Sequence, residues 1–400
     1  MRLHRSLGAL TIGALLLGTA GTAVAQNSTP ESTGGLDTAT RGNLAAITLD
    51  ASSLPDGYAF NGETFLTADQ LASGDVAAAD FNDAGLVGYY ISEYTNSGDG
   101  SIIRSYASAW GDASGVQAGF DLLEDETRTN PDASLTDAAT EVGSDPREIT
   151  TGTIPDANDA NVTYGIADVT FAVDQYLVGV SLQTSDGSEA STDTVNALAA
   201  DLQSRAEGVV SGTAPAGTSL ELPGKVLDLH DIGTTVQEGF LSAAEAEQQL
   251  GLNGSALGGF SASWVDSVGL GDGASSLAPF VTIASTEFSD EAAAQSVVDQ
   301  AADLTPNLEG LAPVDGVEVE GASAVAAFSF SSSAVTGSGV DSFRIVFASG
   351  NTLTVIDVQG APNLDAAQGA ATELATAQVA CAGDASQCAV PSAPASLTAS

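Results

Sequence analysis

The feature that most constrains the fold of this 400-residue chain is an internal repeat. The blocks 44–210 and 220–383 present the same order of patterns: an apolar run, a short helix, a hairpin, a helix, a long connection, a second hairpin and a final helix. A recurring order of this kind indicates duplication of one unit. Hairpins interspersed with helices predict an antiparallel sheet with helices packed on one face. We therefore expect an α+β protein with two tandem similar domains.

Each block opens with an apolar run and a short capped helix. Leu44–Leu49 and Val226–Leu229 read as strands, because short continuous apolar runs are typical of buried strands. Thr67 in the first block and Ser242 in the second each precede a short helical stretch. A Thr or Ser at this position caps the free backbone N–H groups of the first turn, so both are expected to begin helices.

The first hairpin of each block is centred on an Asp-Gly pair, at Gly98–Gly100 and at Gly271–Gly273. Asp-Gly between apolar runs is a strong hairpin signal, because both central turn positions need positive φ. The flanking runs are residues 88–92 and 101–106 in the first block, and 259–264 and 280–283 in the second. An amphipathic helix is expected next, behind Asp112 or Ser114 in the first block and behind Ser289 in the second.

The closing segments of the two blocks match best. Alternating apolar residues predict strand pairs at 169–173 and 176–182, and at 343–347 and 353–358. Asp174-Gln175 forms the predicted turn in the first block, and residues 348–351 form it in the second. A final helix follows in each, with Asp201-Leu202 and Glu373-Leu374 in register.

The N-terminus reads as a cleavable secretory signal peptide over residues 1–25. Arg2 and Arg5 precede the apolar stretch Leu7–Leu17, and Ala23-Val24-Ala25 gives the small-x-small cleavage pattern, so the mature chain is expected to begin near Gln26. The apolar stretch is too short for a membrane-spanning helix, and no cysteine near the cleavage site offers a lipid anchor. A soluble secreted or periplasmic protein without membrane insertion is expected.

Three polar or small-residue segments punctuate the rest of the chain. Residues 26–43 read as a flexible leader, 211–219 as a linker and 384–400 as a flexible tail. The first α+β module is then 44–210 and the second is 220–383.

The two cysteines, Cys381 and Cys388, lie close together near the C-terminus. In an oxidising compartment such a pair forms a local disulfide. The spacing is not C-x-x-C, so a thioredoxin-like redox role has no support, and two thiols alone make a poor zinc site.

The charge balance excludes two classes of partner. The chain has 52 acidic and 9 basic residues and a formal net charge of −43. Binding to nucleic acid or to anionic lipid depends on Lys and Arg that neutralise phosphate, so neither is expected as a partner. Hydrophobic residues make up 43%, which argues against disorder. Adaptation to salt or acid, cation binding, and a genome composition that depletes Lys all remain open as sources of the acidity.

His230 is the one histidine beyond the signal peptide, and Asp228 and Asp231 flank it. A Ser-His-Asp site needs a nucleophile on a constrained turn, and no G-x-S-x-G supplies one. We interpret His230 as a strand-edge histidine paired with a neighbouring carboxylate. Trp110 and Trp264 lie in or end predicted hairpin strands, where core packing is the expected role.

No cofactor or metal is expected from the motifs. The EF-hand spacing D-x-[DN]-x-[DN]-G-x₅-E is absent, and so are a P-loop and a G-x-G-x-x-G that opens a helix. Asn96–Gly100, Gly269–Gly273 and Asp156–Asn161 carry oxygen ligands, but hairpin turns and a solvated loop explain them without calcium. The few cations, such as Arg104 and Arg344 in predicted strands, are expected to be intramolecular ion-pair partners.

Leu54-Pro55-Asp56-Gly57-Tyr58 resembles the L-P-x-G-aromatic opening of many secreted bacterial lipoproteins and sensor modules. With the Tyr- or Trp-ended strand, the Ala-rich helix and the closing hairpin and helix, block 44–210 resembles the extracytoplasmic sensor domains of bacterial Ser/Thr kinases and Mog1/PsbP-like secreted lipoproteins. The chain departs from them in having no lipobox cysteine, no kinase or transmembrane segment and no intradomain cysteine pair. The resemblance implies a non-catalytic module that binds a ligand or partner.

The leading hypothesis is therefore a secreted, non-enzymatic protein that binds an unidentified ligand or protein partner outside the cytoplasm. Two alternatives stay open: a salt-adapted structural envelope protein, and a hydrolase that uses carboxylates or His230. No catalytic, cofactor-binding or metal residue is assigned, and the predicted disulfide between Cys381 and Cys388 is the one assigned site.

Overall fold

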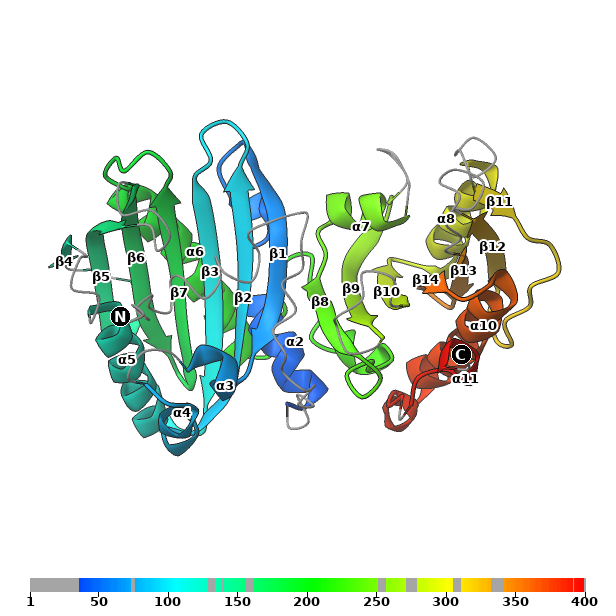
Figure 1. Ribbon diagram of the computed structural model, residues 1–400, viewed down its shortest axis with the longest axis horizontal. Coiled ribbons are helices and arrows are strands. Elements are labelled where there is room, and N and C mark those ends of the chain that lie inside the picture. Colours follow the sequence, from blue (N-terminus) through cyan, green and yellow to red (C-terminus); the bar gives the residue numbers. More distant parts are fainter. Residues whose placement is uncertain are drawn as a thin grey trace, which may run out of the picture. The chain divides into compact units, whose positions relative to one another are not determined.

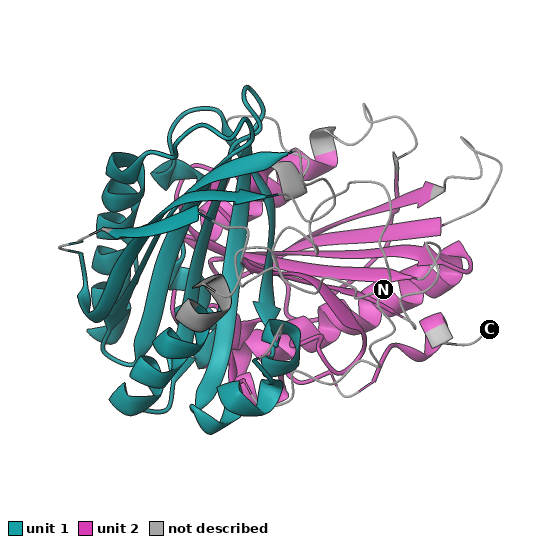
Figure 2. Cartoon of the chain, turned by 60° about the vertical axis from the view of Figure 1, so that its left-hand side comes forward, with its two compact units in different colours: residues 1–22, 40–215 teal, residues 23–39, 216–400 magenta. Residues whose placement is uncertain are grey.

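The computed structural model describes most of the chain beyond its first 35 residues. The described residues are 36–72, 76–128, 134–138, 140, 142–155, 162–250, 257–270, 279–304, 311–331, 341–390 and 392–398. From residue 40 on, they form two compact units, 40–215 and 216–400, which Figure 2 shows in different colours. The signal peptide lies outside the described residues.

The first unit is built on a seven-stranded antiparallel sheet (Figure 1). Its strands are β1 (Tyr58–Leu66), β2 (Leu86–Asn96), β3 (Ile102–Trp110), β4 (Ser134–Ala138), β5 (Ser144–Pro155), β6 (Thr163–Val173) and β7 (Tyr176–Thr184). They are ordered β1-β2-β3-β7-β6-β5-β4, so the closing hairpin β6–β7 inserts beside β3. The predicted turns at Gly98–Gly100 and Asp174-Gln175 join β2 to β3 and β6 to β7.

The second unit repeats this sheet strand for strand. Its strands are β8 (Thr234–Phe240), β9 (Phe260–Gly269), β10 (Phe280–Phe288), β11 (Leu311–Pro313), β12 (Ala324–Ser331), β13 (Asp341–Ser349) and β14 (Thr352–Ala361). Read from β8, the order is β8-β9-β10-β14-β13-β12-β11, with β14 inserted beside β10 as β7 is beside β3. The predicted α+β class with two similar antiparallel-sheet domains is confirmed.

Helices connect the strands in the same places in both units. The first unit has α2 (Thr38–Ile47), α3 (Ala68–Leu71), α4 (Ala78–Asp83), α5 (Ala113–Arg128) and α6 (Thr192–Val210); the second has α7 (Ala243–Leu250), α8 (Glu291–Leu304), α10 (Leu364–Gly383) and α11 (Ala395–Thr398). Short 3₁₀ helices are η1 (Ala51–Ser53), η2 (Pro223–Lys225) and η4 (Ala385–Gln387). Within the described ranges, no helix is long and apolar enough to cross a membrane.

The predicted caps of the short helices are confirmed. Thr67 forms a capping box with Gln70, and Ser242 does the same with Glu245. Asp112, rather than Ser114, accepts the free N–H groups at the start of α5. At the start of α8 the carboxylate of Asp290 accepts the N–H of Ala293, so Asp290 caps this helix and the expectation of Ser289 was wrong.

The helices, which we expected on one face of each sheet, cover both faces. Residues Tyr176 to Gln183 of β7 are all buried, although successive side chains point to opposite faces. Leu177 packs with Phe120 of α5 in one apolar cluster, while α6 packs against β6 and β7. In the second unit Leu353 joins the cluster of α8, and α10 packs against β13 and β14.

The two opening runs are not strands. Residues 44–47 belong to α2, where the buried Leu44 and Ile47 are spaced for one helix face. Val226–Leu229 forms a single β-bridge, between Asp228 and Ala389, and its Leu227 and Leu229 N–H groups donate to side chains. Since a short apolar run does not distinguish strand from buried helix or segment, burial rather than pairing explains both runs.

The expected flexible ends are partly ordered. Helix α2 begins at Thr38, inside the segment expected to be a leader, and its Arg41 is buried. At the other end, the described part of 384–400 contains η4 and α11, and buries Cys388 and Leu397. The predicted disulfide between Cys381 and Cys388 is formed, and it closes this end onto α10.

Candidate functional site

A buried cluster of one histidine and three carboxylates lies against the edge of the second sheet. The imidazole of His230 is held from both sides: Nδ1 lies 2.6 Å from Asp228 Oδ1, and Nε2 lies 2.8 Å from Glu238 Oε2. The side chain of His230 is 8% exposed and that of Glu238 is 2% exposed. Asp266 is the third carboxylate, and ligand atoms of Asp228, His230 and Asp266 all lie within 4.8 Å of one another. These four residues are called the acid–histidine cluster below.

The cluster joins two strands to the segment that follows η2. Glu238 of β8 and Asp266 of β9 are directly paired in the sheet. Asp266 Oδ2 accepts the N–H of Leu229 at 2.9 Å, which fixes the covering segment over β9. The buried Leu229 anchors the same segment by its side chain. Glu238 and Asp266 therefore come from the sheet, whereas Asp228 and His230 come from the segment lying on it.

The electrostatics of the cluster follow from this crowding. Burial lowers the pKa of His230, but hydrogen bonds with Asp228 and Glu238 outweigh burial and raise that pKa to about 10. Burial raises the pKa of Asp266 to about 7, and the charge of Glu238 adds to the effect. Asp266 Oδ1 is buried and has no hydrogen-bond partner among the described residues. A buried acceptor of this kind is costly.

At the corresponding place, the first unit also has a buried glutamate on its edge strand. Each edge strand has a β-bulge, between Phe60 and Gly62 in β1 and between Thr235 and Gln237 in β8. The residue just after the bulge region is a buried glutamate in both, Glu63 and Glu238. The shared bulge therefore aligns the two glutamates, although the surrounding sequences differ.

The partners of the two glutamates have diverged. Glu63 pairs across the sheet with Ser92 and accepts a hydrogen bond from the Tyr90 hydroxyl. In the second unit the residue opposite Glu238 is Asp266, and the glutamate contacts His230 of the covering segment. The Tyr90 hydroxyl thus donates to the glutamate of the first unit, whereas the glutamate of the second unit contacts an imidazole and pairs across the sheet with a carboxylate residue.

Other buried charges form pairs inside each unit, as predicted for the rare cations. Arg104 Nε contacts Glu93 Oε2 at 2.6 Å, with both side chains almost fully buried. Arg344 binds Asp357 through two bonds of 2.6 Å. The remaining described pairs are Arg147–Asp145, Arg205 with Asp50 and Asp201, and Lys225 with Glu221 and Glu287.

The positions singled out in the sequence fall in three groups. His230 is paired with Asp228 as interpreted, but in a turn rather than a strand, and Asp231 is exposed. Trp110 and Trp264 are both 2% exposed, which confirms their packing role. Of the oxygen-rich stretches, Asn96–Gly100 is a hairpin turn in which Asp99 accepts hydrogen bonds from Ser101, whereas 156–161 and 271–273 lie outside the described residues.

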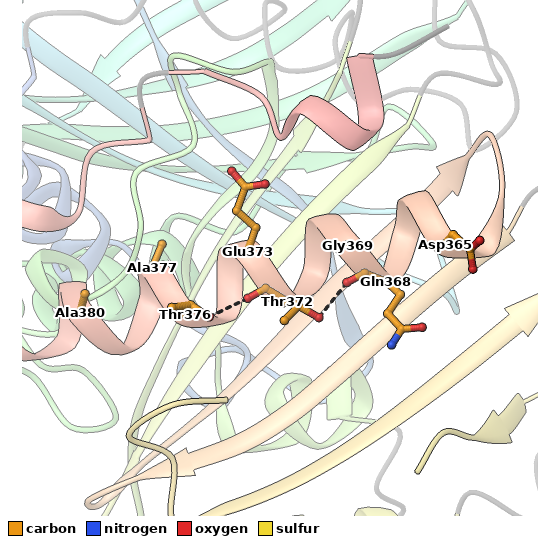
Figure 3. Close-up of a pocket in the computed structure, with 8 residues that line it drawn as sticks. All are labelled: Asp365, Gln368, Gly369, Thr372, Glu373, Thr376, Ala377 and Ala380. Atoms are coloured by element: carbon orange, nitrogen blue, oxygen red, sulfur yellow. Dashed lines mark hydrogen bonds between the residues drawn. The ribbon is translucent and has the colours of Figure 1, made fainter. Parts of the chain in front are cut away.

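A shallow groove of about 800 Å³, largely open to solvent, runs along α10 in the second unit. Figure 3 shows the eight lining residues, which all come from this helix: Asp365, Gln368, Gly369, Thr372, Glu373, Thr376, Ala377 and Ala380. The hydroxyls of Thr372 and Thr376 donate to the carbonyls of Gln368 and Thr372, at 2.8 and 3.0 Å. Their hydrogens are thereby used within the helix, and methyl groups and small side chains are left to form the floor.

The fold and the cluster define a two-domain α+β protein made of duplicated antiparallel sheets. No protein-family model matches the chain, and no curated protein matches it. Among solved structures, the chain is similar to the extracellular domain of PknH from Mycobacterium tuberculosis, at 14% identity and a TM-score of 0.30. The match covers 46% of this chain and 98% of that one.

Proposed function

We propose that this protein acts outside the cytoplasm as a non-catalytic binding protein, and that its ligand lies in the groove along α10. The groove carries the proposal: its volume of about 800 Å³ is within the range of small-ligand sites, and its open shape suits a ligand that stays partly in solvent. The signal peptide expected over residues 1–25 supports export.

The lining of the groove favours a ligand with an apolar body and a positive charge. Gly369, Ala377 and Ala380, with the methyl groups of the threonines, offer apolar contact. Asp365 and Glu373 place carboxylates along the same stripe (Figure 3). A net charge of −43 raises the local concentration of cations near the surface and repels anions.

The environment of His230 supports the non-catalytic part of the proposal. A general base needs a free nitrogen within reach of substrate and a pKa near the working pH. Asp228 and Glu238 contact both ring nitrogens, and the pKa of His230 is raised to about 10. The imidazole is therefore held protonated at neutral pH and has no nitrogen directed at a substrate.

The two units also differ at the groove. With Asp201-Leu202 aligned to Glu373-Leu374, Ala377 of α10 corresponds to Arg205 of α6. Arg205 is a long side chain tied to Asp50 and Asp201. The small residue at the equivalent place supports specialisation of the second unit for binding.

The test uses two aromatic dyes of opposite charge, cationic crystal violet and anionic anilinonaphthalene sulfonate. The full chain is expected to bind crystal violet and to leave the anionic dye free. Thr376→Arg places a cation in the groove and is expected to weaken crystal violet binding at least about tenfold, which corresponds to about 1.4 kcal/mol. The matched control, Ala197→Arg, adds the same charge to an exposed position on α6 and should leave binding unchanged. Equal binding in both variants, or binding of neither dye, would refute the proposed site.

A further inference from the structure

The acid–histidine cluster has a composition that a folded protein interior rarely holds without a cation. Three carboxylates, Asp228, Glu238 and Asp266, face one imidazole. The cations Arg104, Arg147, Arg205, Lys225 and Arg344 are each paired with other carboxylates. Three carboxylates gathered around one imidazole place an excess of acidic groups together, two of them deeply buried, which is costly.

Asp266 gives a second and independent observation that points to a ligand. Asp266 is 2% exposed, and its Oδ1 has no hydrogen-bond partner among the described residues. Its other oxygen, Oδ2, is held by the N–H of Leu229, so the orientation of the carboxylate is fixed. A carboxylate oxygen of Asp266 lies within 4.8 Å of ligand atoms of both Asp228 and His230.

We propose that Asp228, His230 and Asp266 bind a divalent transition-metal ion of the zinc class, and that Glu238 orients the imidazole from its other ring nitrogen. Imidazole with carboxylates is a donor set for zinc and its neighbours, whereas calcium and magnesium take oxygen ligands. Metal-bound histidines almost always donate the second ring N–H to a carboxylate or carbonyl. Glu238 Oε2 lies 2.8 Å from His230 Nε2, close enough to take that role.

Binding of the ion requires the side chains of the cluster to rearrange. Donors at about 2.1 Å from a tetrahedral zinc ion lie about 3.4 Å from one another. The contact of 2.6 Å between His230 Nδ1 and Asp228 Oδ1 must open to admit the ion. Asp228 is the ligand that can move, because its side chain is 33% exposed, and the same exposure gives the ion a path from solvent. The ion takes the place of the imidazole proton, which is released to solvent.

The first unit provides a built-in comparison. Its aligned glutamate, Glu63, is satisfied by the Tyr90 hydroxyl, and Ser92 lies where the second unit has Asp266. Hydroxyls in these places do not form a metal site of this kind. Glu63→Gln is therefore a matched control, since it alters a buried glutamate at the equivalent edge-strand position without touching the proposed ligands.

The test is a calorimetric titration of the full chain with zinc chloride, with excess calcium present to occupy exposed carboxylates. We expect one equivalent of zinc to bind to wild type and to Glu63→Gln, and no such binding to His230→Gln or Asp266→Asn. Glu238→Gln should retain the stoichiometry and lose about 10- to 100-fold in affinity, as expected for a residue that orients a ligand. Absence of zinc binding to wild type, or equal binding in all variants, would overturn the proposal.

Histidine-selective ¹⁵N labelling keeps the proposal testable if a variant does not fold. The full chain has two histidines, His4 and His230, so the imidazole signals are few. Zinc is expected to shift the Nδ1 signal of His230 in the wild-type protein and to leave Nε2 protonated. Unchanged His230 signals at saturating zinc would overturn the proposal independently of any substitution.

Discussion

Asp228 donates its backbone N–H to the carbonyl oxygen of Cys388 at 2.8 Å. On its other side, the carbonyl of Asp228 accepts the N–H of Val390 at 3.4 Å. Because Cys388 is bonded to Cys381 in α10, the disulfide holds the loop that positions the most exposed member of the acid–histidine cluster. The local disulfide therefore connects the C-terminal end to the candidate metal site.

Replacing both cysteines by serine tests this connection. The bond closes a short loop, with a sequence separation of 7. Its loss should lower the free energy of unfolding by about 2–3 kcal/mol by the chain-entropy estimate. It should also weaken zinc binding, because Asp228 loses its fixed neighbour. Urea denaturation measures the first effect, and an unchanged midpoint would contradict it.

The buried pair Arg104–Glu93 is expected to be sensitive to removal of one partner. Arg104→Met leaves the Glu93 carboxylate buried without its cation, which costs about 3–5 kcal/mol. The control is Arg147→Met, because Arg147 is half-buried and its partner Asp145 is exposed, so this solvent-accessible pair should contribute no more than about 1 kcal/mol. Chemical denaturation of the two variants checks the ranking, and equal losses would contradict it.

Gly119 on α5 lies directly against the ring of Trp110. A Cβ at residue 119 would come within 2.2 Å of the Trp110 ring, so Gly119→Ala forces the helix or the ring to move. Overpacking of this kind costs about 1–3 kcal/mol. Gly224→Ala is the control, since its Cβ would meet nothing within 4 Å. A Gly119→Ala variant as stable as Gly224→Ala would contradict the expected overpacking against Trp110.

The stability of the first unit should fall as pH rises through the window set by Asp168. Burial raises the pKa of Asp168 to about 7, although hydrogen bonds from Thr170 and Tyr106 oppose the shift. The folded form thus binds a proton more tightly than the unfolded chain, whose pKa is near 3.8. The contribution of Asp168 to the free energy of unfolding is fully present below pH 3.8 and is lost as pH rises to about 7.

Asp168→Asn removes this titration and serves as the comparison. Its melting temperature should depend less on pH between 4 and 8 than that of wild type, because the amide stays neutral throughout. Thermal unfolding in buffers of equal ionic strength measures the difference. Parallel pH profiles of the two proteins would contradict the assignment to Asp168.

Local signals predicted most of the sheet hairpins and helices because each is specified by nearby residues. The alternation around Asp174-Gln175 and the capping box at Thr67 are examples. The strands that were missed, such as β1 and β5, pair with distant or irregular partners, and bulges such as that between Phe60 and Gly62 interrupt their alternation. The prediction of a strand at Leu44–Leu49 was wrong, because an apolar run can be buried either as a strand or as a helix.

Only part of the candidate site could be predicted from the sequence. Asp228 was found because it lies two residues from His230, whereas Glu238 and Asp266 reach the histidine only through the pairing of β8 with β9. One sequence signal does mark Asp266, because it is a charged residue within the strand β9. Its position opposite Glu238, and hence its meaning, depends on sheet register. No sequence signal marks the α10 groove, because Thr, Ala and Gly do not distinguish this helix from others.

The central claim is that two copies of one fold have diverged, and that the second copy carries the binding chemistry. A crystal of the full chain grown with zinc, measured on both sides of the zinc absorption edge, tests this most directly. We expect an anomalous peak bonded to Asp228, His230 and Asp266, and none beside Glu63 and Tyr90. Peaks confined to exposed carboxylates, or a peak at the first unit's Glu63, would contradict it.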